Sequence, residues 1–352
     1  MNSYRAVALL VLAPLLAPVP VLAKGRVERL AGQLEAVRDA DTDERLRLVA
    51  ALGRSGDDEA LAPLLKQFRF RKDKPAVSAA VALALGRLAD RGAVGSLLEC
   101  WDHLESLRLR GELSPAFQRL RSAVLEALGL IGDKKASPVV LAALADEDDA
   151  VALAAIEATA RLKERKAVDS LMGLAGSDPR FIASVYEALG EIKDSRARPV
   201  LLRGAKGDDP SAAAAASYAL IRMGDGSGKE ALRKLVVEGQ GKAALKAAFY
   251  LAKLDESEGV DKLLAVLHDQ DSAFRASAAA YLAQAGNRKA VGPAAETLER
   301  SKDPELRRLC VTVLAGVGGP KAVHALSRAS EDEDASVAGA ARAGLADLGE
   351  GD

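Results

Sequence analysis

Aromatic side chains, histidines and cysteines are all scarce in this chain of 352 residues. Phe, Trp and Tyr make up 3% of the sequence, so the interior has to be packed with Leu, Val and Ala, which lets neighbouring helices come close together. The histidines are His103, His268 and His324, and the cysteines are Cys100 and Cys310. These positions are too scattered for a zinc site, and no Ser or Cys lies in a recognisable catalytic motif. We therefore predict no metal, no cofactor and no catalytic residue, and a protein that is not an enzyme.

An excess of charge of one sign is also missing. The chain has 49 Lys and Arg residues against 50 Asp and Glu residues, a net charge of −1. Nucleic-acid-binding domains usually carry a basic excess, so we expect no nucleic acid partner. No apolar run after residue 24 reaches the length that a bilayer requires, and no run of alternating Val, Ile and Thr predicts a sheet. The mature chain should therefore be all-α and free of integral membrane segments.

What the sequence does contain is a repeat. A Leu preceded by Ala or another small or apolar residue recurs every 30 to 33 residues, apart from one interval of 43 residues. Thr159 occupies one of these Leu positions; the other anchors are Leu52, Leu85, Leu128, Leu189, Leu220, Leu251, Leu282, Leu314 and Leu345. A period of this length indicates stacked units and not one globular core.

Each unit is expected to be a pair of helices. In the ninth unit, Asp303 and Pro304 provide an N-cap and a first helical residue, and Gly318-Gly319 ends the helix. Apolar residues at spacings of three and four continue on both sides of this turn. The prediction is about 20 helices: a lone first helix from about 26 to 38, nine pairs, and a final helix ending near Gly349. We expect the second helix of each pair to line the concave side.

These units resemble the short HEAT-like repeats of the type found in bilin lyases. The resemblance rests on Asp303-Pro304-Glu305-Leu306-Arg307, on Ala127-Leu128-Gly129 and on Ala188-Leu189-Gly190, and it covers about residues 43–349. It implies an α-α superhelix, an armadillo-like helical solenoid of about ten repeats. None of the histidines is followed by Glu, so the paired His-Glu motifs of HEAT-like di-iron hydroxylases are absent. Arrays of this kind mostly carry binding surfaces.

The N-terminus has the pattern of an export signal. Arg5 precedes an apolar stretch from Ala6 to Leu16, and Val21-Leu22-Ala23 fits a signal peptidase site before Lys24. An uncleaved membrane anchor is the alternative, but Pro14, Pro18 and Pro20 break the N-terminal segment. We predict a signal peptide at 1–23, a capping helix at 24–42, a repeat domain at 43–352, and a location in the periplasm or outside the cell.

One region departs from the regular pattern and is our candidate for partner binding. The connection between the first two units is rich in Arg, Lys and Phe, and the next connection carries the chain's only Trp within the 12 additional residues. Arg and aromatic side chains are enriched at binding hot spots. The predicted partner-binding residues are Arg69, Phe70, Arg71, Lys72, Trp101 and His103. The alternative is that the aromatic residues are buried as a cap over the N-terminal edge.

The combined prediction is a non-catalytic, exported scaffold or adaptor that binds protein partners in the cell envelope. Two alternatives differ from it in what they require. A bilin-lyase-like or other small-molecule-handling enzyme would need several titratable groups in one pocket. A self-assembling structural protein would use the unpaired final helix as its contact.

Overall fold

The structure is a computed structural model that describes residues 21–348. Residues 1–20 and 349–352 lie outside the described part, so most of the predicted signal peptide at 1–23 and the last residues of the predicted repeat domain do too. The first described helix, α1, spans Val21–Ala36, in the region where a lone first helix was predicted.

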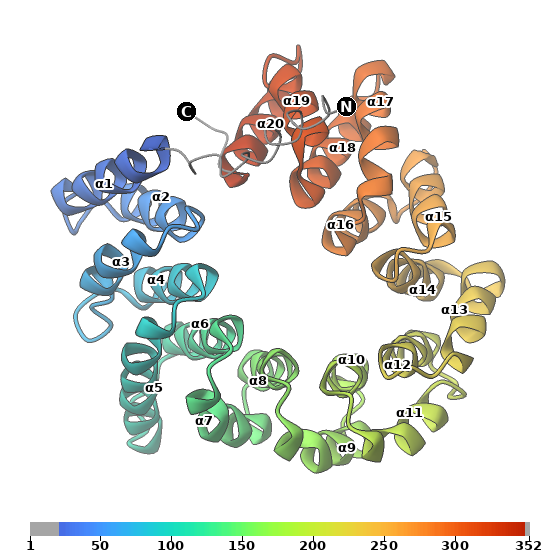
Figure 1. The fold of residues 1–352 in the computed structure, drawn as a ribbon, viewed down its shortest axis with the longest axis horizontal. Coiled ribbons are helices and arrows are strands. Elements are labelled where there is room, and N and C mark those ends of the chain that lie inside the picture. Colours follow the sequence, from blue (N-terminus) through green and yellow to red (C-terminus); the bar gives the residue numbers. More distant parts are fainter. Residues whose placement is uncertain (1–20, 349–352) are drawn as a thin grey trace, which may run out of the picture.

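Residues 21–348 fold into α-helices joined by short turns, and this part of the chain contains no strand. The helices form two concentric layers (Figure 1). The inner layer consists of α2 (Thr42–Gly53), α4 (Pro75–Leu88), α6 (Pro115–Ile131), α8 (Asp149–Leu162), α10 (Ile182–Ile192), α12 (Pro210–Arg222), α14 (Gly241–Lys253), α16 (Arg275–Ala285), α18 (Pro304–Val317) and α20 (Ala335–Asp347). The outer layer consists of α1, α3 (Leu61–Gln67), α5 (Val94–Leu109), α7 (Ser137–Ala142), α9 (Val168–Ser177), α11 (Arg198–Gly204), α13 (Ser227–Glu238), α15 (Ser257–His268), α17 (Val291–Arg300) and α19 (Pro320–Ala329).

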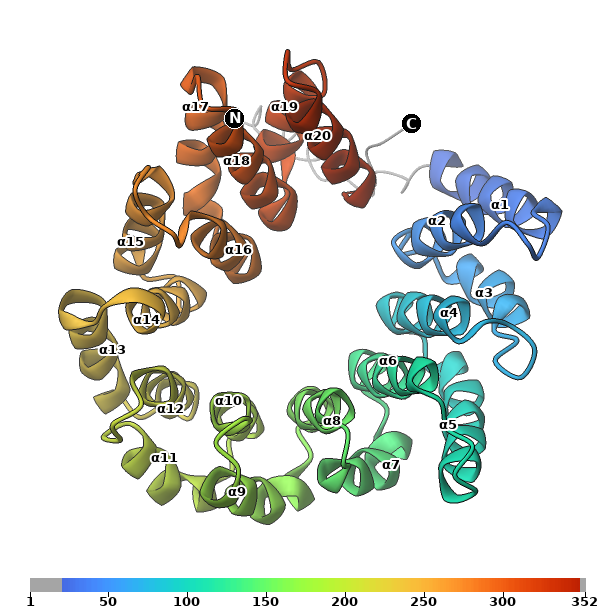
Figure 2. The same cartoon turned by 180° about the vertical axis from the view of Figure 1, so that it is seen from behind.

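The array bends until its two ends face each other, so the molecule is a nearly closed ring (Figures 1 and 2). One ion pair spans the seam: Nη1 of Arg54, just after α2, lies 2.9 Å from Oδ1 of Asp347, the last residue of α20. The predicted all-α superhelix of about ten repeats is confirmed. The prediction about its concave side is wrong, because the first helix of each repeat, and not the second, forms the inner layer.

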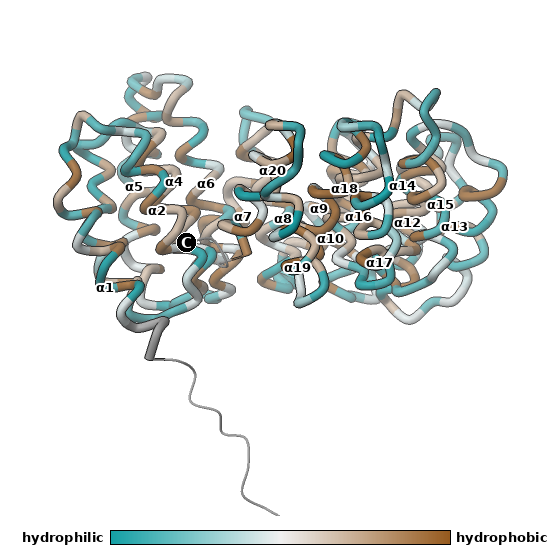
Figure 3. The backbone as a smooth tube through the Cα atoms, turned by 90° about the horizontal axis from the view of Figure 1, so that it is seen from above, coloured by the Kyte–Doolittle hydropathy of each residue, from teal (hydrophilic) through white to brown (hydrophobic). Residues whose placement is uncertain are grey.

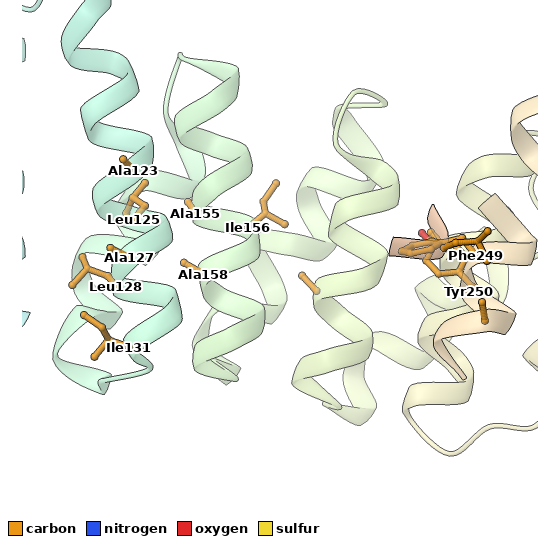
Figure 4. Packing of buried hydrophobic residues seen from close by; sticks show 14 of the residues in the cluster. Ala123, Leu125, Ala127, Leu128, Ile131, Ala155, Ile156, Ala158, Phe249 and Tyr250 are labelled. Carbon is orange, nitrogen blue, oxygen red and sulfur yellow. The ribbon is translucent and has the colours of Figure 1, made fainter. Parts of the chain in front are cut away.

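Small residues on the inner helices explain this arrangement. The Gly that follows the Leu anchor of one repeat lies against the Ala that precedes the anchor of the next. A methyl group added at Gly53, Gly86 or Gly190 would be 2.6 Å from the Cα of Ala84, Ala127 or Ala219 respectively. The inner helices therefore approach closely, and Ala158, which lies against Gly129 of α6, is on the side of α8 that faces α6 (Figure 4). Because an array bends toward its more closely spaced layer, these contacts place the first helices on the concave side.

Most of the turns from inner to outer helices share one design. In six of them an acidic or Asn side chain accepts a hydrogen bond from the backbone N–H two residues later, as Asp133 does from Lys135. A short 3₁₀ turn follows, and its third residue is a fully buried Ala; these turns are Asp58–Ala60, Arg91–Ala93, Lys134–Ala136, Arg165–Ala167, Ser195–Ala197 and Arg288–Ala290. A seventh 3₁₀ turn, Ala143–Ala145, extends α7.

Buried Arg–Asp ion pairs connect neighbouring repeats near both ends of the array. Arg121 is 1% exposed and donates to Oδ2 of Asp146, in the next outer-to-inner turn. Arg45 pairs in the same way with Asp73, and Arg307 with Asp332. Removing one partner of such a pair leaves an uncompensated buried charge, so these positions tolerate change poorly.

The two irregularities in the sequence have local explanations. Most of the additional residues in the second repeat extend α5, which has 16 residues where α3 and α7 have 7 and 6. Thr159 is fully buried in its Leu position, and its hydroxyl donates to the carbonyl of Ile156 at 2.7 Å. The hydroxyl is thus satisfied within α8 and does not interrupt the packing.

The Gly–Ala contacts can be tested by adding one methyl group. We expect Gly86→Ala to destabilise the protein by about 1–3 kcal/mol, because the new methyl overlaps Ala127 and the backbone has to move. Gly173→Ala is the matched control, since nothing lies within 4 Å of its added methyl in α9, and it should gain about 0.5–1 kcal/mol from helix propensity. Thermal and chemical unfolding would measure both. Equal effects of the two substitutions would contradict the close-contact account.

Candidate functional site: the concave face of repeats 3 to 8

The six residues predicted from the sequence lie in the α3–α4 connection and on α5. Phe70 and Trp101 are buried, with 9% and 5% of their surface exposed. The Phe70 ring lies 5.8 Å from the ring of His103, and the guanidinium of Arg121 lies 5.0 Å from the Trp101 ring. Both aromatic side chains therefore pack inside the protein, where a partner does not reach them.

The cations among the six are partly committed to ion pairs. Arg69 contacts Asp39 at 2.6 Å and Asp73 at 3.0 Å, and Arg71 contacts Glu99 at 3.2 Å. The pKa of His103 is lowered by burial and by the charges of Arg71 and Arg110. Arg71 and Lys72 are exposed, so partner binding at this surface stays a prediction that rests on them.

The structure brings a different set of residues together on the inner helices. Four aromatic side chains from three successive repeats are in contact, and we call them the aromatic cluster: Tyr218, Phe249, Tyr250 and Tyr281. The rings of Tyr218 and Tyr250 are stacked with centroids 4.7 Å apart, and those of Phe249 and Tyr281 with centroids 4.9 Å apart. Phe249 and Tyr250 link the two stacks at 5.4 Å and lie side by side on α14 (Figure 4).

The aromatic cluster lies toward the concave side of the ring. The hydroxyl of Tyr250 on α14 donates to Oε1 of Glu187 on α10 at 2.6 Å, although α12 lies between these two helices. Side chains that are two repeats apart can meet only where the inner helices converge, which is the concave side. Burial and the nearby charge of Glu187 raise the pKa of Tyr250, so its hydroxyl remains a hydrogen-bond donor.

Two lysines lie over the aromatic rings. The Lys246 ammonium is 5.1 Å from the ring centres of both Phe249 and Tyr250, and it pairs with Glu187 at 3.4 Å. The Lys253 ammonium is 4.9 Å from the Tyr218 ring centre and 5.4 Å from that of Phe249. Lys253 is exposed and has no carboxylate partner within residues 21–348. Cation–π contacts hold this ammonium in place while it remains available to an anionic group.

In the preceding repeats, carboxylates occupy the positions that correspond to Tyr218 and Phe249. Glu126, Glu157 and Glu187 each lie two residues before an anchor, on α6, α8 and α10. The side chain of Glu157 reaches solvent, although many protein atoms lie near it on the concave side. Desolvation raises its pKa, Arg161 partly offsets this, and Glu126 and Glu187 raise it further. The concave face is therefore acidic along repeats 3 to 5 and basic and aromatic along repeats 6 to 8.

A signal for this site was present in the sequence. Tyr218 and Phe249 are 31 residues apart, as are Tyr250 and Tyr281, and both pairs are in phase with the Leu anchors. Glu126, Glu157 and Glu187 follow the same phase. The surface predicted from the sequence is a departure from the repeat, whereas the concave residues are substitutions within it.

The aromatic cluster and its two lysines can contact a partner through stacking, cation–π and ionic interactions. Within the described range, no group of His, Cys, Asp and Glu side chains is placed to hold a metal ion. Burial raises the pKa of both thiols, Cys100 and Cys310, to about 12, so neither is an activated nucleophile. None of the helices in residues 21–348 combines the length and hydropathy needed to cross a membrane.

Comparison with known families agrees with the geometry. Residues 30–113 and 108–185 each match the family model for HEAT repeats. Residues 30–185 of the chain consist of HEAT repeats. No curated protein sequence matches this HEAT-repeat protein significantly.

Several solved structures match this chain over most of its length at low identity. The HEAT-repeat protein is 19% identical to human deoxyhypusine hydroxylase in complex with glycerol, with a TM-score of 0.36 and coverage of 93% of this chain and 97% of that one. It is 20% identical to an engineered protein, with a TM-score of 0.33 and coverage of 93% and 99%. It is 18% identical to a chain in the complex of CpcE and CpcF of phycocyanin lyase from a Nostoc species, with a TM-score of 0.34 and coverage of 92% and 97%. Similarity at this level gives no information on ligands or activity.

The acidic stretch of the concave face predicts a pH effect. Because the pKa of Glu157 is raised in the folded state, the folded protein binds this proton more tightly, and stability falls as pH rises above the ordinary range of a Glu side chain. Glu157→Gln should therefore raise the melting temperature at about pH 8, by the equivalent of less than about 1 kcal/mol, and change little at about pH 4. Glu147→Gln, on the exposed α7–α8 turn, is the control and should show no such difference. Destabilisation by Glu157→Gln at the higher pH would contradict the electrostatic account.

Proposed function

We propose that this HEAT-repeat protein is a non-catalytic scaffold or adaptor, exported to the cell envelope, that holds a protein partner against its concave face. The observation that carries the proposal is the exposed, unpaired Lys253 ammonium held over the rings of Tyr218 and Phe249. An ordered cation on an aromatic support is typical of an interaction hot spot. Export rests on the N-terminal sequence pattern alone.

Charge on the concave face indicates what the partner presents. Glu126 and Glu157 have no ion-pair partner among residues 21–348, and Lys253 has none either. An extended polypeptide with basic side chains along repeats 3 and 4 and a carboxylate near repeat 7 would complement both groups. Affinity would be distributed over several repeats, as expected for a curved solenoid surface.

The test is crosslinking capture from the native envelope fraction with three forms of the full chain. The concave variant carries Glu157→Lys and Lys253→Glu, which reverses both signs at unchanged net charge. The second variant carries Arg71→Glu and Lys72→Glu at the surface predicted from the sequence. We expect the wild type to capture a defined protein. The concave variant should capture at least about tenfold less of that protein, and the second variant should capture as much of it as the wild type.

Other outcomes have distinct meanings. Loss only in the second variant would move the binding site to the α3–α4 connection. Capture of nothing by any form would contradict the scaffold proposal and favour small-molecule handling or self-assembly. Thermal melts of all three forms show whether a loss of capture reflects loss of folding.

A further inference from the structure

All inner-to-outer turns lie along one edge of the ring. The inner helices run in the same direction, so their C-termini, and the turns that follow, come to one edge, while the outer-to-inner turns come to the other. Viewed from the side, both edges are hydrophilic and the apolar residues lie between them (Figure 3). Equivalent turns of successive repeats therefore present their side chains in one plane.

In repeats 3 to 5 the inner-to-outer turns are strongly basic. Their exposed cations are Lys134, Lys135, Lys163, Arg165, Lys166, Lys193, Arg196 and Arg198. Two of the acidic residues in these turns, Glu164 and Asp194, cap the turns from within and are only 6% and 2% exposed. The charge presented outward is accordingly positive.

Four of these cations have no carboxylate partner within residues 21–348, and we call them the basic edge: Lys135, Lys163, Lys166 and Lys193. Their neighbours are paired; Lys134 lies 3.4 Å from Glu164, Arg165 lies 2.9 Å from Asp194, and Arg196 lies 2.9 Å from Asp169. The paired residues stabilise the turns, whereas the charges of the basic edge have no such use within the described fold.

The opposite edge of the same repeats is acidic. The α7–α8 turn carries Asp146, Glu147 and Asp148, and the α11–α12 turn carries Asp208 and Asp209. Repeats 3 to 5 are thus polarised across the ring, although the whole chain has a net charge of only −1. An extended anionic surface would attract one edge and repel the other, which fixes an orientation.

We propose that the basic edge docks on the surface of a bilayer that contains anionic phospholipids. A plane of headgroups matches a planar row of lysines, whereas a folded acidic protein would require a shaped surface as well as charge. The contact is electrostatic and does not involve insertion, because the large apolar side chains that are most exposed in the described residues, Leu109 and Val237, lie at the C-terminal ends of the outer helices α5 and α13, toward the other edge. In this orientation the acidic edge faces away from the bilayer.

The experiment is co-sedimentation of the full chain with two kinds of vesicle, one of pure phosphatidylcholine and one with roughly one-third phosphatidylglycerol. The test variant carries Lys135→Glu, Lys163→Glu, Lys166→Glu and Lys193→Glu. The matched control carries Lys72→Glu, Lys206→Glu, Lys242→Glu and Lys302→Glu, with the same change of net charge; three of these exposed lysines lie in outer-to-inner connections, and Lys242 lies at the start of α14. A third form with Gln at the four basic-edge positions removes charge without reversing it, and thermal melts check the folding of every form.

We expect the wild type to bind the phosphatidylglycerol vesicles and not the pure phosphatidylcholine vesicles, and added salt to weaken binding. Partitioning of the test variant into the phosphatidylglycerol vesicles should be at least about tenfold weaker than that of the wild type. The Gln form should show a smaller loss, and the control should lose less than about twofold. Equal binding to both vesicles, or equal loss in test and control variants, would overturn the proposal. Binding to soluble polyglutamate without binding to anionic vesicles would also overturn it, by identifying an acidic polypeptide as the ligand.

Discussion

The structure depends on how closely successive inner helices approach one another. Gly53, Gly86, Gly129 and Gly190 each lie against an Ala of the next inner helix, with no room for another methyl group. The outer helices have no equivalent row, so each of these contacts adds a bend in the same direction. Four of the nine steps between successive inner helices carry this contact, and the nine steps together bring α20 back to α2 and allow Arg54 to reach Asp347. The contact draws the inner helices together in the first half of the array and so places them on the concave side.

The same constraint explains where the aromatic cluster can form. In repeats 6 and 7 the residues after the anchors are Ile221 and Ala252 and not Gly, so the close Gly contact is not repeated there. Aromatic rings fill the space between the inner helices instead, and lysine side chains cover the rings on the concave side. A change in packing thus coincides with a change in surface chemistry from acidic to basic and aromatic.

The repeat and its helix pairs could be predicted from the sequence because they depend on local signals: the Leu anchors, Asp-Pro starts such as Asp303-Pro304, and Gly turns. The inner position of the first helices could have been predicted from the Ala-Leu-Gly triplets, since only the inner layer needs small residues on both sides of the anchor. Ring closure could not be predicted from the sequence, because a small difference in the angle between successive repeats accumulates over nine steps. The burial of Phe70 and Trp101 also depends on tertiary packing, through His103 and Arg121.

The most direct test of the central claim is the distance between the two ends of the array. Labels attached at Arg54→Cys and Asp347→Cys would report it by pulsed electron paramagnetic resonance, and the buried native thiols, with pKa values raised to about 12, should not compete for the label. The ring predicts a single short distance that corresponds to neighbouring side chains. An open superhelix with nine steps of about 10 Å would separate the labels by on the order of 90 Å, and that result would contradict the account.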